Sequence, residues 1–306
     1  MLGSIRRRTG RLAARGGTRL RQAHLWLTGR SVSKRDLLEG LRDLGIERGD
    51  VIFVHSSLGS LGYVRGGPRA VIESLYEAVG PEGTLMVPTY FVPGGTVLAA
   101  ARTPGYVFDP RRHGANLGAL PSAFLKFPGI ERSIHPTHSV SAVGKQARYV
   151  TEGHHRAPSI FGAGSPWDRL IELGGKVVGL GVSMGPISFY HVLQDRVLDA
   201  YPIPVHLKET FVMKCRDWDG NLNEVPVRAY DPAHAVRRID QKGREDLRRY
   251  FWREFERAGL LNSGRVGEAT AWFIPARQFY EHLHRLMLEG ITTYSTPEEF
   301  ERRPIS

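Results

Sequence analysis

His191 carries the side chain best suited to proton transfer, within a segment that runs from residue 181 to residue 194. An imidazole has an unperturbed pKa near neutrality, so a histidine can act as a general base at physiological pH. The apolar run 176–182 is short, β-branched and bounded by glycines, which predicts a buried strand. A glycine and a proline interrupt this run, and Ser188 can then cap a helix that carries His191 in its first turn. In open α/β sheets such a position borders the crevice in which ligands bind. The alternative to a functional role is a histidine that only packs against its own helix.

A second segment with potential binding chemistry follows an earlier apolar run, residues 51–54, which predicts another buried strand. This strand delivers His55-Ser-Ser to its carboxyl end, and Gly66-Gly-Pro then leads into a helix over 69–79. A small polar loop and a glycine pair at a helix N-terminus can bind an anionic group. The spacing fits neither a P-loop nor a dinucleotide fingerprint, and an ordinary strand-to-helix loop is the alternative.

The elements that must position these residues alternate along the chain. Ser33 and Asp36 match a capping box, so the folded part is expected to begin near residue 31. Apolar patterns predict further strands over 84–90 and after Arg132. Helical spacing predicts helices over 117–127, 167–173 (capped by Ser165) and 278–288, and either a helix pair or one long helix over 233–258. The segment 91–116 is predicted to be a long loop.

This order of elements predicts an α/β fold with a mixed, mostly parallel central sheet, helices on both faces and a C-terminal helical lobe. The helical lobe comes from the last two helical segments, which are rich in charged and aromatic residues. We therefore expect residues 31–306 to form a single domain.

The composition is typical of globular proteins: of 306 residues, 41% are apolar and 24% are charged. No apolar run approaches the roughly 20 residues that a membrane-spanning helix requires. The single cysteine, Cys215, cannot form an internal disulfide, which is typical of a protein from the reducing cytoplasm. The apolar residues that flank Cys215 in the sequence favour a role in the core over a role as a catalytic nucleophile.

The first thirty residues differ from the rest in charge. They contain eight arginines and no acidic residue, so they supply eight of the net +11 charges and leave +3 for residues 31–306. We interpret residues 1–30 as a basic N-terminal extension, either a solvated tail or an arm that contacts a second copy of the chain. Contact with an anionic membrane or a nucleic acid is the alternative. The remaining sequence has neither zinc-ligand spacing nor a basic-aromatic RNA motif, so we expect no nucleic-acid partner.

Several short motifs occur in order along the chain: His55-Ser-Ser-Leu, Gly67-Pro, Gly80-Pro-Glu-Gly-Thr-Leu-Met-Val-Pro, Phe108-Asp-Pro, Arg132-Ser-Ile-His-Pro and Ser165-Pro. With the glycine-flanked strand before His191, they resemble the aminoglycoside 3-N-acetyltransferase family from about residue 34 to about residue 290. The resemblance implies direct transfer of an acetyl group from acetyl-CoA, a co-substrate, to a primary amine of an aminoglycoside-like acceptor, an activity that confers antibiotic resistance. A thioester is already activated, so we expect no metal.

The resemblance places the catalytic base at His191, in Phe189-Tyr-His-Val-Leu-Gln. Such a base needs a carboxylate that holds its tautomer and stabilises its charged form. In the family this carboxylate comes from a strand pair further along the chain, which implies Asp217 or Asp219 here. A structural role is the alternative, chiefly for Asp219, because Asp-Gly is typical of a hairpin turn.

The resemblance also implies where acetyl-CoA binds. Ser56, Ser57 and Ser139 are small polar groups expected to contact the pantetheine arm or the thioester carbonyl, with capping as the alternative role. Gly67 precedes the helix whose N-terminus is expected to attract the coenzyme phosphates. His135 lies in the family's His-Pro motif near the coenzyme, with structural hydrogen bonding as the alternative.

The sequence departs from the family at two places. Gln194 occupies the position of the family's glutamate, so the shape is kept but a charge near His191 is lost. The loop 91–102, where aminoglycoside-modifying members tend to carry acids, has no carboxylate, and the first one after it is Asp109. These departures favour two alternatives: an acyltransferase acting on another amine, such as an amino sugar or a biosynthetic intermediate, or a non-catalytic CoA-binding homologue.

Overall fold

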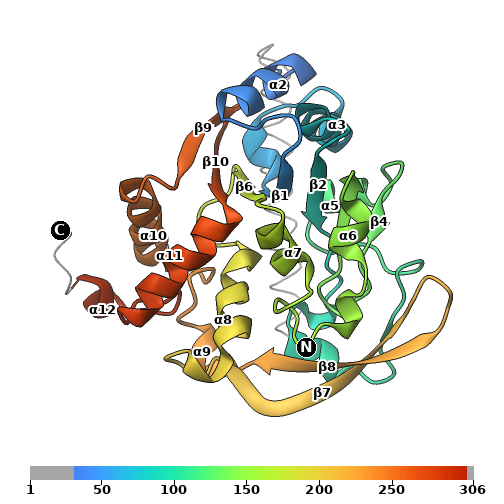
Figure 1. Ribbon diagram of the computed structural model, residues 1–306, viewed down its shortest axis with the longest axis vertical. Helices are drawn as coiled ribbons and strands as arrows, with labels where there is room; N and C mark the ends of the chain where they lie inside the picture. The colour runs from blue at the N-terminus through green and yellow to red at the C-terminus, as the bar shows by residue number, and fades with distance from the viewer. Residues whose placement is uncertain (1–30, 302–306) are drawn as a thin grey trace, which may run out of the picture.

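The computed structural model describes residues 31–301, and its centre is a seven-stranded sheet in the order β4-β5-β2-β1-β6-β10-β9 (Figure 1). The central strands β1 (Val51–Ser56), β2 (Thr84–Pro88) and β6 (Lys176–Leu180) are buried along nearly their whole length. Their continuous apolar sequences suit strands that are covered on both faces. The outer strands are β4 (Glu131–Arg132), β5 (Val140–Gly144), β9 (Asn262–Val266) and β10 (Ala269–Pro275).

Within the seven-stranded sheet, parallel pairing is confined to the three central strands, where β1 pairs with both β2 and β6. The other pairings, β2 with β5, β5 with β4, β6 with β10 and β10 with β9, are antiparallel. The predicted α/β fold with a mixed sheet is confirmed, but the parallel part is smaller than the sequence suggested. For two of the four antiparallel pairings, β4 with β5 and β9 with β10, the reason is that a short loop joins the two strands and permits only antiparallel pairing.

Helices cover both faces of the sheet, as predicted. Along β1, Ile52 and Val54 face one core and Val51 and Phe53 face the other, because successive strand residues point in opposite directions. The first core includes residues of α2 (Lys34–Asp43), α3 (Gly67–Val79) and α5 (Ala119–Phe124). The second includes residues of α6 (Ala147–Thr151), α7 (Pro166–Glu172), α8 (His191–Val197), α10 (Glu245–Arg257), α11 (Ala276–Leu288) and α12 (Pro297–Glu301).

A second sheet of three strands contains β3 (Val107–Phe108), β7 (His206–Arg216) and β8 (Leu222–Tyr230). Strands β7 and β8 form a long hairpin that runs along the bottom of the molecule in Figure 1. His206 pairs with Tyr230 at the open end of the hairpin, and Arg216 pairs with Leu222 next to its turn. The open end and the turn of the hairpin therefore lie in different parts of the molecule.

Local features agree with the sequence in most places. Ser33 forms the predicted capping box with Asp36, and Ser165 caps α7 by accepting a hydrogen bond from the backbone of Asp168. Cys215 is fully buried, as expected of a core residue.

The segment 91–116, predicted to be a plain loop, also contains α4 (Val97–Ala101) and β3. The segment 233–258 divides into α9 (Pro232–Ala235) and α10. Short 3-10 turns occur at Leu58–Leu61, Pro93–Gly95, His154–Arg156, Ser188–Tyr190 and Leu198–Ala200.

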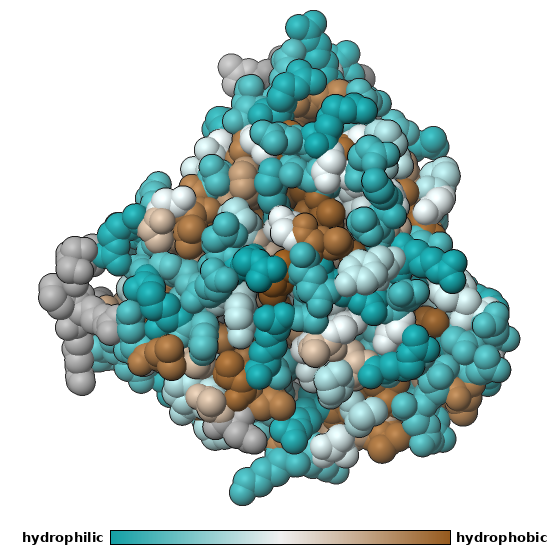
Figure 2. All heavy atoms as spheres, in the orientation of Figure 1, coloured by the Kyte–Doolittle hydropathy of each residue, from teal (hydrophilic) through white to brown (hydrophobic). Residues whose placement is uncertain are grey.

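The visible face in Figure 2 carries small groups of hydrophobic residues among hydrophilic ones. Within residues 31–301, no helix is both long enough and apolar enough to cross a bilayer. The predicted basic extension, residues 1–30, lies outside the described residues, and the single domain over 31–306 stays a prediction.

Candidate active site

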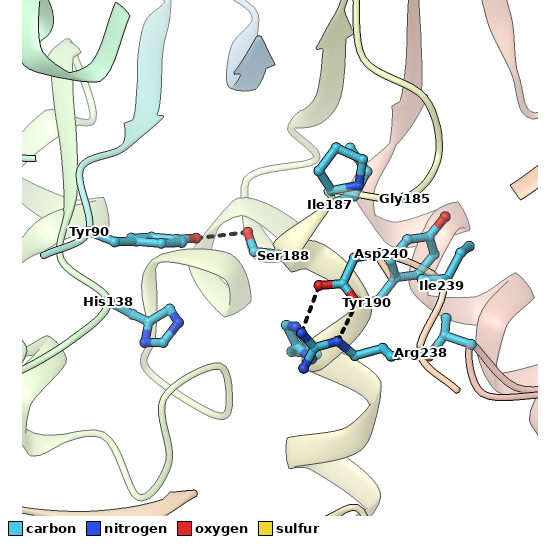
Figure 3. Close-up of a pocket in the computed structure, with 12 residues that line it drawn as sticks. Tyr90, His138, Gly185, Ile187, Ser188, Tyr190, Arg238, Ile239 and Asp240 are labelled. Carbon is cyan, nitrogen blue, oxygen red and sulfur yellow. Dashed lines mark hydrogen bonds and ion pairs between the residues drawn. The ribbon is translucent and has the colours of Figure 1, made fainter. Parts of the chain in front are cut away.

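Two adjoining cavities lie beyond the carboxyl ends of β2 and β6. The smaller, of about 190 Å³, lies between Tyr90, which follows β2, and the segment 185–191, which leads into α8 (Figure 3). The larger, of about 760 Å³, reaches the segment around α4 and the start of α9. Both cavities are lined by Tyr90, His138, His191 and Arg238. Two ligands held in separate cavities would therefore meet beside His191.

His191 is held in one orientation by a neighbour on its own helix. The Nδ1 atom of its imidazole lies 2.9 Å from Oε1 of Gln194, three residues later. The amide nitrogen of Gln194 donates to the hydroxyl of Thr293, which leaves the amide oxygen to accept from His191. The proton of neutral His191 is then on Nδ1, and Nε2 carries the free lone pair. The ring also packs against Phe161 and Tyr230, with centroid distances of 4.9 and 4.8 Å.

The electrostatic surroundings keep His191 neutral. Burial and the positive charge of Arg238 lower the pKa of His191 to about 4, although the hydrogen bond to Gln194 and the charge of Asp240 act in the opposite direction. An imidazole with this pKa is unprotonated at neutral pH, so it can accept a proton there. The arrangement therefore provides a general base that faces two cavities.

The carboxylate whose charge acts on His191 is that of Asp240. This residue was not identified from the sequence. Both of its oxygens accept hydrogen bonds from Arg238, at 2.6 and 2.7 Å, in a planar bidentate pair (Figure 3). Arg238 also lies over the ring of Tyr230, 5.6 Å from its centroid. Asp240 follows α9 in a highly charged segment, and no local pattern distinguishes it from its charged neighbours.

Ser188 has a different role from the predicted helix cap. It begins a 3-10 turn and makes no capping hydrogen bond. Its hydroxyl oxygen accepts hydrogen bonds from the Tyr90 hydroxyl, at 2.8 Å, and from the Trp167 indole, at 3.1 Å. The nearest acceptor for its own proton is Nε2 of His55, at 3.4 Å. Ser188 lines the smaller cavity, so its hydroxyl is available to a ligand there.

His135 and Ser139, two of the predicted coenzyme contacts, are buried and line neither cavity. His135 stacks on His154 at 4.5 Å, and its Nδ1 accepts from the backbone of Thr137 and His138. Ser139 accepts from Arg132 and donates to the carbonyl of Thr89. These hydrogen bonds give both residues a structural role, and their contact with a coenzyme stays a prediction. His138, three residues after His135, lines both cavities.

Ser56, Ser57 and Gly67 lie where the sequence placed them. Ser56 ends β1, and the backbone of Ser57 donates to the carbonyl of Leu180 at the end of β6. Gly67 begins α3 with a φ of +60°, and a Cβ at this position would meet open space. None of the three lines the two cavities, so their contact with a coenzyme stays a prediction.

Asp217 and Asp219 lie at the turn of the β7–β8 hairpin and do not meet His191. Asp217 accepts hydrogen bonds from the backbone of Asp219 and Asn221, which closes the turn. His191 contacts the opposite end of the hairpin, at Tyr230. Arg216 lies ten residue steps along β7 from His206, the partner of Tyr230, which at about 3.3 Å per residue is roughly 33 Å. The structure therefore does not support the prediction that Asp217 or Asp219 pairs with His191. Both residues belong to the hairpin turn, which was the alternative structural role.

We expect Asp217→Asn and Asp219→Asn each to leave kcat/KM within about twofold of the wild-type value, because neither carboxylate reaches His191. Asp217→Asn should lower the melting temperature slightly, since it weakens the hydrogen bonds of the turn. Steady-state kinetics beside thermal unfolding separates the two effects. A hundredfold loss of kcat in either folded variant would restore the aspartate as the partner of His191.

The comparisons with known proteins agree over most of the chain. A family model described as aminoglycoside 3-N-acetyltransferase matches residues 53–288. An aminoglycoside N(3)-acetyltransferase III from Salmonella sp is 30% identical over 255 residues, which are 80% of this chain and 87% of the relative. An aminoglycoside N(3)-acetyltransferase IX from Micromonospora chalcea is 33% identical over 267 residues, which are 81% of this chain and 91% of the relative.

Solved structures show the same fold. One, named AAC-IIIb binary with CoASH, superposes with a TM-score of 0.71 at 26% identity and covers 87% of this chain and 100% of its own. A histidine-to-alanine mutant of aminoglycoside acetyltransferase AAC(3)-IVa, in complex with a gentamicin, superposes with a TM-score of 0.67 at 26% identity and covers 89% of this chain and 94% of its own. The sequence and structural comparisons thus identify the same group of proteins.

Proposed function

The chain belongs to the aminoglycoside 3-N-acetyltransferase family, and we propose that it transfers the acetyl group of acetyl-CoA to a primary amine of an aminoglycoside-like acceptor. One structural relative binds coenzyme A and another binds a gentamicin, which supports both substrates. The observation that carries the proposal is the meeting of two cavities at a neutral histidine whose Nε2 lone pair is free.

In this proposal the larger cavity holds the acceptor and the smaller one receives the thioester end of acetyl-CoA. Nε2 of His191 takes a proton from the amine as the amine nitrogen attacks the thioester carbon. The new C–N bond forms first, and the C–S bond breaks when the tetrahedral intermediate collapses. The leaving thiolate takes the proton from the His191 imidazolium, so the products are an amide and free coenzyme A.

The tetrahedral intermediate places negative charge on the former carbonyl oxygen, which a fixed hydrogen-bond donor stabilises. Ser188 suits this role, because Tyr90 and Trp167 already donate to its oxygen and its own proton can turn from His55 toward a ligand. Ser56, Ser57 and the helix that begins at Gly67 stay candidates for the rest of the coenzyme, since they lie at the same edge of the sheet.

Gln194→Glu is expected to raise the pKa of His191, because a carboxylate at the same hydrogen-bond position stabilises the imidazolium. The base works only when neutral, so activity falls as the pH drops through this pKa. The acidic limb of the profile of kcat/KM against pH should therefore begin near pH 4 in the wild-type protein and move to higher pH in the variant.

Gln194→Leu is the matched control, since it removes the hydrogen bond without adding charge. It should lower kcat at all pH values and should not move the acidic limb upward. An acidic limb that stays in place in Gln194→Glu would show that His191 is not the group that must be unprotonated.

The test of the function is release of free thiol from acetyl-CoA with a panel of aminoglycosides and simple amino sugars. Turnover with an aminoglycoside would establish the proposed activity. Turnover with other amines alone would assign a different acceptor to the same chemistry. Coenzyme binding without turnover on any amine would contradict the proposal and leave a non-catalytic CoA-binding homologue.

We also propose a cytoplasmic location, supported by the single cysteine and by the use of acetyl-CoA as co-substrate. Contact between two copies through residues 1–30 stays a prediction. Light scattering on the full chain and on a variant that lacks these residues would decide it.

A further inference from the structure

The walls of the two cavities contain little negative charge. Among the described residues that line them, the only carboxylate is Asp240, in the smaller cavity, and the larger cavity is lined by no Asp or Glu. Both oxygens of Asp240 are already occupied by Arg238, and Gln241 donates to one of them at 3.2 Å. The pair of Asp240 and Arg238 has no net charge to offer to a cation.

The two segments outside the described residues contain no acidic side chain that could supply the missing charge. Residues 1–30 contain eight arginines and no Asp or Glu, and residues 302–306 contain two arginines and no Asp or Glu. If either segment approached the larger cavity, its side chains would add positive charge.

Apart from Arg238, the larger cavity is lined by uncharged polar and apolar groups. Its polar side chains include those of Thr96, Asn116 and Gln241, and its apolar side chains include those of Val92, Val97, Leu98, Leu117 and Ala235. An ammonium group that enters such a site loses its hydration and meets no carboxylate. Arg238 also lines this wall, and because its charge is paired with Asp240 it offers an ammonium group no attraction.

We propose that the acceptor carries one amine, which reacts at His191, and that the rest of the acceptor in the larger cavity is uncharged, partly hydroxylated and partly apolar. This inference rests on the proposed N-acetyltransferase function and narrows its aminoglycoside-like acceptor to an amino-sugar glycoside with a single amine. Hydroxyl groups can pair with Thr96, Asn116 and Gln241, while an apolar substituent can cover the side chains of Val97 and Leu98.

The first experiment compares kcat/KM for single-amine acceptors, glucosamine and its alkyl glycosides, with that for gentamicin and sisomicin, which carry several amines. We expect the best alkyl glucosaminide to exceed both polyamines by about tenfold or more. We also expect that kcat/KM for the polyamines changes little between about 0.05 and 0.5 M salt, because no wall charge attracts them. Preference for a polyamine, together with a steep loss of its kcat/KM in salt, would overturn the inference.

The second experiment adds the missing charge at Thr96. The hydroxyl of Thr96 caps α4 by accepting from the backbone of Ala99, and both Asp and Asn can take over this cap. The kcat/KM of Thr96→Asp for gentamicin should exceed that of Thr96→Asn about tenfold, and only the Asp variant should become sensitive to salt. Equal kinetics in the two variants would overturn the inference.

Failure of the inference and failure of the proposed function give different results. If no amine releases thiol from acetyl-CoA, the proposed function fails. Calorimetric titration of the CoA-bound protein with the same amines then still decides the inference: tighter binding of the single-amine glycosides supports it, and tighter binding of the polyamines overturns it.

Discussion

His191→Ala is expected to lower kcat for acetyl transfer by about 10²- to 10⁴-fold, the range that a positioned general base contributes. The side chain lies where the two cavities meet, and its Nδ1 is held by Gln194 at 2.9 Å, so Nε2 has a fixed direction and a free lone pair. None of the other described residues that line both cavities can replace it. Tyr90 keeps its proton, because burial raises the pKa of its hydroxyl far above 10.

The remaining candidate is His138, which also lines both cavities. Burial and the neighbouring His191 lower the pKa of His138 to about 3, and its Nδ1 lies 2.8 Å from the hydroxyl of the adjacent Thr137, so no amide like that of Gln194 fixes its tautomer. His138→Ala is therefore the matched control, and its kcat should exceed that of His191→Ala by at least about tenfold. Kinetics of thiol release beside coenzyme binding and thermal unfolding gives the comparison. If His191→Ala is folded, binds coenzyme and retains more than about a tenth of the wild-type kcat, His191 is not the base.

Arg132→Met is expected to lower the free energy of unfolding by about 3 kcal/mol, since it leaves buried acceptors without a donor. The buried guanidinium of Arg132 donates to Ser139 Oγ and to four backbone carbonyls, those of Thr89, Pro110, His113 and Gly114. It also lies over the ring of Phe108, 5.1 Å from its centroid. These bonds tie the end of β2 to residues 110–114, just before Asn116 and Leu117 on the wall of the larger cavity.

The loss should appear as a decrease of about 6 °C in the melting temperature. Arg132→Lys keeps the charge but has a compact ammonium in place of a planar fork, so it should fall between the wild-type protein and Arg132→Met. Because the segment after residue 110 borders the larger cavity, Arg132→Met should also raise KM for the acceptor more than KM for acetyl-CoA. An unchanged melting temperature in Arg132→Met would show that these hydrogen bonds add nothing to stability.

The sequence by itself determined the features that depend on near neighbours in the chain. The strand that ends in Ser56, the caps at Ser33 and Ser165 and the helix that carries His191 follow from residue patterns that span a few positions. Hydrophobic periodicity and capping act within one or two turns of the chain, so their consequences can be predicted locally. The ordered motifs likewise predicted the family, because they occur along most of the chain.

Only the tertiary structure decided which carboxylate acts on His191. Asp217 and Asp219 seemed suitable by distance along the sequence, but the length and register of the β7–β8 hairpin carry them to its far end. Asp240 reaches the site because the chain returns past Tyr230 through α9, and its pairing with Arg238 sets its position. In the same way, the hydrogen bonds of Ser188, His135 and Ser139 join residues from separate strands and helices. Contacts between distant segments depend on the path of the whole chain, and no local pattern specifies that path.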